Sequence, residues 1–248
     1  VTIKTSDNSN TLRLTSTDAD ADVGPSLNLY RNSGSPADGD SIGDIEFDGR
    51  NDASEDVRYA RIRGRIDDAS DGTEDSKLIF EVIAAGSQQE AVRFEPSGIV
   101  FNESSNDVDF RVESNGNTHM LFVDGGNDKV MIGLETPDVF NGTTPPLQIE
   151  GTDNNKASLS ITRNSNDNGQ PLLILSKSRG TSVNSDTIVQ DNDVVGEIVF
   201  LGADGNDRNS QVATIQATVD GTPGSNDMPG ALSFRTTADG AATATERM

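Results

Sequence analysis

The chain contains one stretch of alternating sequence twice, and this repeat restricts its possible folds more than any other feature. The first copy starts at Gly43–Gly49 (Gly-Asp-Ile-Glu-Phe-Asp-Gly) and the second at Gly196–Gly202 (Gly-Glu-Ile-Val-Phe-Leu-Gly). The central isoleucines, Ile62 and Ile215, have the same spacing as the two starts, and both copies end on a Leu-x-Phe run. Self-similarity over this length indicates one structural unit that is used twice.

Each copy alternates between apolar and polar residues with a period of two. Ile45 and Phe47 share one face of an extended chain, and Ile198 and Phe200 repeat that arrangement. This period, with β-branched and aromatic residues bounded by Gly and Asp, predicts half-buried antiparallel strands. A helix would need apolar residues three and four positions apart, and no long window supplies them.

Further alternating runs predict strands outside the two copies, and Asn, Gly and Asp turns separate them. The predicted strands are Thr11–Thr15, Ser26–Arg31, Val100–Asn102, Val108–Glu113, Met120–Gly126, Lys129–Gly133, Leu147–Ile149 and Leu173–Lys177. The fold class is therefore all-β, with two related antiparallel β-modules of β-sandwich type. We place the first module at residues 1–100, a connector of short stalk-like strands and a linker at 101–146, and the second module at 147–248.

The low apolar content bears on how such modules become stable. Hydrophobic residues make up 32% of the chain, so one copy has few side chains to offset the entropy lost on folding. Modules this polar gain stability when several chains share one core. We therefore expect an obligate oligomer. The predicted core residues are Ile45, Phe47, Ile62, Phe80, Ile198, Phe200, Ile215 and Phe234.

Charge and composition exclude several classes of partner. The net charge of −22 repels nucleic-acid phosphates and anionic lipids, so we expect no nucleic-acid partner. No apolar run approaches the roughly 20 residues that span a bilayer, so we expect no membrane insertion. The chain has no cysteine, which excludes a disulfide framework and thiolate chemistry.

The connector contains three short motifs, Phe110–Asn117, Leu121–Asn127 and Val130–Gly133. Together they resemble the stalk repeat of bacteriophage tail-fibre and tail-spike proteins. The run Pro229–Gly240, continuing into the end of the chain, resembles the segment before another such repeat. The sequence departs from the family pattern at Met131 and at Leu134–Glu135. In many fibres of this type an intramolecular chaperone domain follows.

The resemblance implies an elongated, strand-rich homotrimer that belongs to a virion and presents a host-attachment tip. Its partners would be other tail, neck or capsid proteins, with a host surface glycan or protein bound through a distal region. The fibre would be a structural protein and not an enzyme, and it would need no cofactor.

The acidic residues leave two alternative functions open. Asp18, Asp20 and Asp22 have the spacing of the first three ligands of an EF-hand loop, although the glycine comes one position late and Leu29 replaces the bidentate Glu. A calcium-binding extracellular adhesin is therefore one alternative. The other is a glycan depolymerase tail spike, which would need a fixed pair of carboxylates. Solvated acidic loops explain both patterns more simply.

Nucleophilic and zinc chemistry have little support in the sequence. His119 is the only histidine, so a Ser-His-Asp triad would have to use it. It lies beside an Asn/Gly turn, which favours a polar surface residue. Without cysteine, a zinc site would depend almost entirely on carboxylates.

Overall fold

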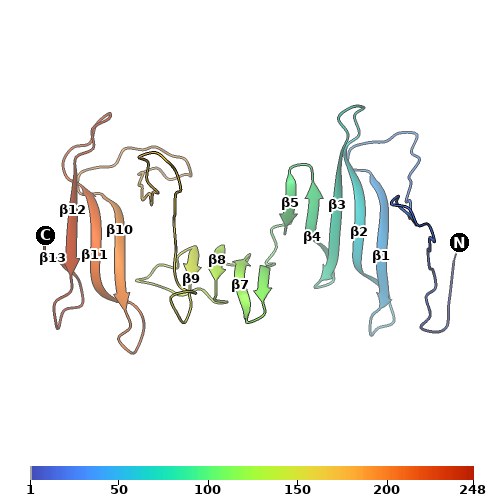
Figure 1. Cartoon of the computed structure of the whole chain (residues 1–248), viewed down its shortest axis with the longest axis horizontal. Coiled ribbons are helices and arrows are strands. Elements are labelled where there is room, and N and C mark those ends of the chain that lie inside the picture. The colour runs from blue at the N-terminus through green and yellow to red at the C-terminus, as the bar shows by residue number, and fades with distance from the viewer. Residues whose placement is uncertain (1) are drawn as a thin grey trace. The chain divides into compact units, whose positions relative to one another are not determined.

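The computed structural model describes residues 2–248, and strands and loops make up this part of the chain (Figure 1). Within these residues the strands form a five-stranded sheet and two four-stranded sheets, with no helix. The described residues therefore contain no helix long and apolar enough to cross a membrane. The predicted all-β class with antiparallel sheets is confirmed.

The first sheet is an antiparallel meander in which every strand pairs with its neighbour in the chain. One row crosses it from Ile45 through Ile62 and Phe80 to Val92, so the alternating pattern places these apolar residues on a single face. Its strands are β1 (Ser41–Arg50), β2 (Asp56–Asp68), β3 (Asp75–Ala84), β4 (Ser87–Glu95) and β5 (Gly98–Phe101).

The last sheet has the same strand-pair geometry as the start of the first. Ile198, Ile215 and Phe234 form its central apolar row. The register of its first strand pair is interrupted at two places, and both fall at positions equivalent to the two interruptions between β1 and β2. Its strands are β10 (Val194–Gly202), β11 (Ser210–Val219), β12 (Gly230–Thr236) and β13 (Thr245–Glu246).

The middle sheet is built from the connector and has the order β6-β7-β8-β9. Its last two strands run parallel, with Met131 beside Gln148. Met131 has no exposed surface and Phe122 is buried, so this small sheet has a core of its own. Its strands are β6 (Phe110–Ser114), β7 (Asn117–Asp124), β8 (Lys129–Ile132) and β9 (Leu147–Ile149).

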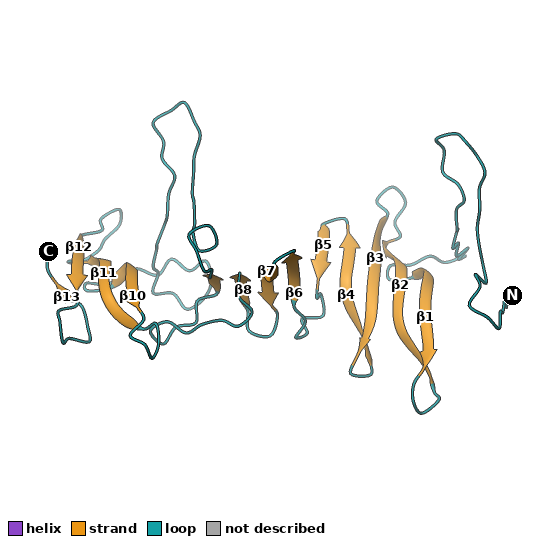
Figure 2. Cartoon of the chain, turned by 60° about the horizontal axis from the view of Figure 1, so that its bottom comes forward, coloured by secondary structure: helices purple, strands orange, loops and turns teal. Residues whose placement is uncertain are grey.

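Three predicted strands belong to no sheet of the described chain. Residues 11–15, 26–31 and 173–177 are extended, but a strand needs a hydrogen-bonded neighbour, and none lies beside them in residues 2–248. Figure 2 draws the two segments that contain them as long loops, one before β1 and one between β9 and β10.

The chain divides into two compact units. One contains the residues up to Phe110 together with Asp124–Asn127, and the other contains Arg111–Val123 and Asp128–Met248. The first unit therefore holds the whole five-stranded sheet, and the second holds the last sheet together with the middle sheet apart from Phe110 and Asp124. The apolar face of each large sheet carries exposed side chains, so within the described residues it is not covered by the second layer that a β-sandwich requires.

Candidate assembly surface

The apolar face of the first sheet is open to solvent in the isolated chain. Ile45 and Phe47 are exposed on β1, Phe47 by 53%, and Phe94 and Phe101 continue the face across β4 and β5. The rings of Phe80 and Phe94 meet edge to face with their centroids 5.9 Å apart. A monomeric soluble protein rarely leaves a contiguous apolar surface of this kind uncovered.

The opposite face of the same sheet carries charges that are paired within the chain. Arg63 donates two hydrogen bonds to Asp44, at 3.0 and 2.9 Å, and Arg61 forms an ion pair with Glu81. These long side chains cover Ile79, which is only 3% exposed. The charged face is therefore largely satisfied without a partner, whereas the apolar face is not.

The hydrogen bond from Arg63 also fixes the charge state of this face. It holds the pKa of Asp44 below its ordinary value of 3.8, with partial burial opposing the shift and the nearby arginine charges adding to it. Asp44 is therefore ionised at neutral pH, and it anchors the ion pairs that hold β1 to β2.

The last sheet repeats the exposed apolar face. Ile198 and Phe200 on β10 are exposed, Phe200 by 49%, and Leu232 and Phe234 on β12 are also exposed. Its opposite face buries Thr214, Gln216 and Ser233 and also carries Glu197 and Arg235. The side-chain oxygens of Thr214 and Ser233 and the Nε of Arg235 are buried there without a hydrogen-bond partner among the described residues. The two sheets thus share an uncovered apolar face and differ on the other.

Surface area gives the scale of what remains uncovered. The chain exposes 18659 Å². Two separate compact units that share its 26.2 kDa equally would expose about 12,800 Å² by the scaling of folded monomers. The excess, about 6,000 Å² by that scaling, is larger than the roughly 2,000–5,000 Å² that many obligate interfaces bury.

The eight residues predicted to form a core lie together, four on each of these faces. Ile62, Phe80 and Ile215 are half-buried, and the other five are exposed within the single chain. Their role in assembly stays a prediction. Sequence reasoning missed Phe94 and Phe101, although Val92 and Phe94 continue the same period of two.

The residues considered for calcium lie in the loop before β1. Asp18 accepts hydrogen bonds from the N–H groups of Ala19 and Asp20, and Asp20 accepts one from the N–H of Asp22. These bonds within the turn use carboxylate oxygens that a cation would need. Binding of calcium at this loop stays a prediction.

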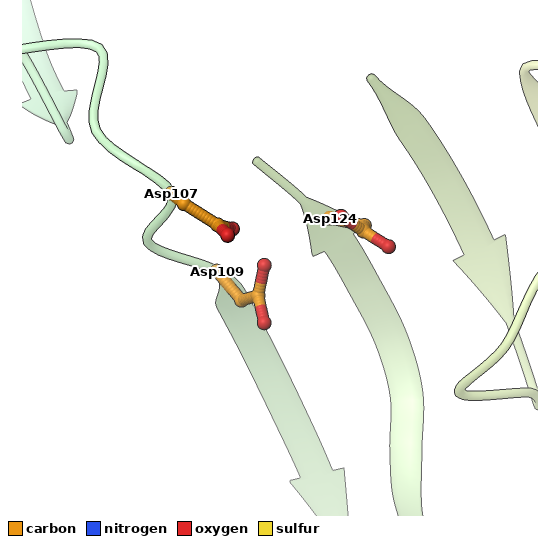
Figure 3. Close-up of side chains that lie close together, drawn as sticks. All are labelled: Asp107, Asp109 and Asp124. Atoms are coloured by element: carbon orange, nitrogen blue, oxygen red, sulfur yellow. The ribbon is translucent and has the colours of Figure 1, made fainter. Parts of the chain in front are cut away.

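A different acidic group brings three carboxylates together (Figure 3). Asp107 and Asp109 come from the segment that leads into β6, and Asp124 ends β7; their ligand atoms lie within 4.8 Å of one another. Asp109 accepts a hydrogen bond from the N–H of Gly125 at 3.0 Å, and Asp124 accepts one from the N–H of Gly126 at 3.1 Å. Asp109 and Asp124 therefore close the turn after β7, which accounts for the approach of these two carboxylates.

His119 on β7 contacts neighbours that give it a packing role. Its ring lies edge to face against Phe122, with centroids 5.1 Å apart. One ring nitrogen is 3.1 Å from the Thr118 hydroxyl, and the other is 3.5 Å from the Arg111 guanidinium. These contacts do not provide the carboxylate that orients a catalytic histidine.

A hollow of about 420 Å³ lies between Asp138–Phe140 and the loop that joins β10 to β11, within the second unit. Arg208 from that loop lies over the Phe140 ring, 5.6 Å from its centroid, and pairs with Glu150 at 3.1 Å and with Asp138. Arg208 thereby holds the two loops against each other.

Comparison with known proteins gives a similarity of fold alone. No protein-family profile matches the chain, and no curated protein matches it. Two solved structures of the carboxy-terminal domain of the bacteriophage T5 L-shaped tail fibre are similar. The first has 14% identity and a TM-score of 0.33, and the match covers 93% of this chain and 84% of that one. The second includes the intramolecular chaperone domain; it has 13% identity, a TM-score of 0.34, and coverage of 95% and 59%.

Proposed function

We propose that this chain is a structural protein of a virion appendage, a phage tail fibre or a close equivalent, and that it assembles as a homotrimer. The observation that carries the proposal is the pair of uncovered apolar faces, one on each large sheet; on the first sheet the opposite face is paired within the chain. A second copy of the same chain offers the same apolar faces and so can cover them.

The sequence of the connector supports the two finer parts of this proposal, that the protein is a fibre and that it contains three chains. The run from Phe110 to Gly133 resembles the stalk repeats of tail fibres and tail spikes, which are trimeric. In this arrangement the modules at 1–100 and 147–248 each contribute one sheet per chain to a shared core, and the connector at 101–146 joins them. The core comprises Ile45, Phe47, Ile62, Phe80, Ile198, Phe200, Ile215 and Phe234.

The mechanism of such a fibre is mechanical. The shared cores give rigidity, so that a distal tip is held away from the particle while other virion proteins hold the opposite end. The net charge of −22 keeps the outer surface soluble and suppresses non-specific association. Closing the trimer also covers sheet edges that would otherwise pair with other chains.

Native mass tests this proposal directly. We expect light scattering at near-physiological salt to give a species of about three times 26.2 kDa. The mass should be unchanged by a chelator, because the apolar faces and not a metal hold the chains together. A folded monomer of 26.2 kDa would refute the shared core. A trimer that dissociates on chelation would instead favour the calcium-dependent adhesin.

A further inference from the structure

Two long loops of the chain have no backbone partner. We call residues 10–30 the first arm and residues 158–178 the second arm. Among the described residues, no backbone–backbone hydrogen bond joins either arm to itself or to the rest of the chain. Unpaired N–H and C=O groups in an extended chain are a template for strand pairing.

Both arms carry the apolar pattern of a strand. Leu12 and Leu14 alternate on the outward run of the first arm, and Leu27 and Leu29 alternate on its return; Leu12 is 61% and Leu27 is 62% exposed. The second arm repeats this arrangement with exposed residues at Leu159, Ile161, Leu173 and Leu175. Apolar residues at every second position are expected where one side of a strand is covered and the other faces water. The pattern therefore indicates that both arms have a partner.

The root of each arm lies on the apolar face of its own sheet. A Cβ atom at Gly43 would be 2.9 Å from the Cβ of Leu29, and a Cβ at Gly196 would be 2.8 Å from that of Leu175. Gly43 precedes Ile45 by two residues and therefore shares its face, and Gly196 bears the same relation to Ile198. The arms thus leave the sheets at the surface that the proposed trimer covers.

We propose that each arm pairs by backbone hydrogen bonds with a neighbouring copy of this chain, as a strand added to that copy. The partner is a second copy for two reasons. The arms start at the face where copies meet. The excess accessible area, about 6,000 Å², is also larger than the roughly 2,000–5,000 Å² that many obligate interfaces bury. This inference rests on the proposed trimer and adds the strands that link its chains.

Hydrogen exchange on the assembled protein tests the arms separately from the oligomeric state. We expect the amides of Leu12–Leu14 and Leu27–Leu29 to exchange at least about tenfold more slowly than in an unstructured chain. Fast exchange at these amides in a species of trimer mass would overturn the arm inference and leave the trimer standing. A folded monomer would overturn both.

A proline substitution removes one amide and provides a second readout. Asn28→Pro lies in the return run of the first arm, where an extended backbone accepts proline. If the Asn28 N–H pairs with another chain, the variant should lower the thermal midpoint of the trimer. The matched control is Val23→Pro at the tip of the same arm, where Val23 is 94% exposed, and it should leave the midpoint unchanged. Because successive N–H groups of a strand point to opposite sides, Leu27→Pro tests the other side of the same run. Midpoints for both Asn28→Pro and Leu27→Pro equal to that of Val23→Pro would contradict the proposal.

Discussion

At the scale of single residues, a glycine in the first strand of each large sheet makes room for the arm. Leu29 lies over Gly43 and Leu175 lies over Gly196, so the same side-chain contact occurs at equivalent places in the two modules. No residue larger than glycine fits there without moving the backbone of the arm, because the nearest atom is a Cβ rather than the end of a flexible side chain.

Substituting this glycine should therefore destabilise the protein. We expect Gly43→Ala to lower the free energy of unfolding by about 1–3 kcal/mol, the usual cost of overpacking. The control is Gly116→Ala in the β6–β7 turn, where a Cβ meets nothing within 4 Å. Thermal melts of the two variants beside the parent protein make the comparison. An unchanged midpoint for Gly43→Ala would show that the contact with Leu29 is not tight.

Acid should weaken the charged face through Asp44. The folded-state pKa of Asp44 lies below its ordinary value of 3.8 because Arg63 donates hydrogen bonds to the carboxylate. The stabilisation is therefore complete above the ordinary value and is lost as the pH falls through the lowered pKa. We expect the thermal midpoint of the parent protein to drop below about pH 4 more steeply than that of Asp44→Asn. Parallel acid slopes for the two proteins would argue against this role of Asp44.

At the scale of elements, alternation predicted the strands of both modules because each strand has one apolar side. The runs at 43–49, 78–80, 196–202 and 232–234 all lie inside strands of the structure. Sequence reasoning did not identify β4, in which Gln88, Gln89 and Glu90 mask the apolar side. It also could not distinguish strands with partners from the unpaired arms, because the pairing of a strand depends on distant parts of the chain or on another chain.

Local alternation also predicted only part of the candidate assembly surface, because contacts between distant residues depend on the fold. Ile45, Phe47, Ile198 and Phe200 were predicted as core residues from their spacing, and the structure places them on common faces. The opposite faces were not predicted, since the ion pair between Arg61 and Glu81 joins residues of different strands. Convergence of Asp107, Asp109 and Asp124 depends on the fold of the connector in the same way.

Two adjacent residues of β10 separate the roles of the two sheet faces. Phe200 lies on the apolar face, whereas Val199 lies on the other and pairs across to Thr214. We expect Phe200→Asp to prevent assembly, because burying an unpaired carboxylate in each chain costs several kcal/mol. Val199→Asp introduces the same charge beside it and should leave the oligomer intact. Light scattering on both variants measures the difference, and a correctly sized oligomer of Phe200→Asp would count against the assembly surface.

At the scale of the whole molecule, the proposed shared core predicts that folding and assembly occur together. The accessible surface of 18659 Å² on a chain of 26.2 kDa exceeds that of two compact units of this mass, so the isolated chain buries less surface than a folded monomer does. Unfolding should therefore depend on protein concentration, as it does for obligate oligomers whose free subunits are not folded.

The shared register of β1–β2 and β10–β11 has a consequence for how copies find one another. Because both large sheets carry the same kind of apolar face, two copies of the chain can associate in two ways. The first module of one copy can pack against the first module of the other, or it can pack against the second module. When like modules align, every apolar face is covered and the assembly is closed. When a partner is staggered, one apolar face stays uncovered at each end and can bind further chains, so the assembly becomes an open-ended polymer. The two modules differ on their opposite faces, because the first is lined by ion pairs such as that between Arg61 and Glu81 and the last mainly by the buried side chains of Thr214, Gln216 and Ser233. This difference favours alignment of like modules over the staggered alignment that leads to a polymer.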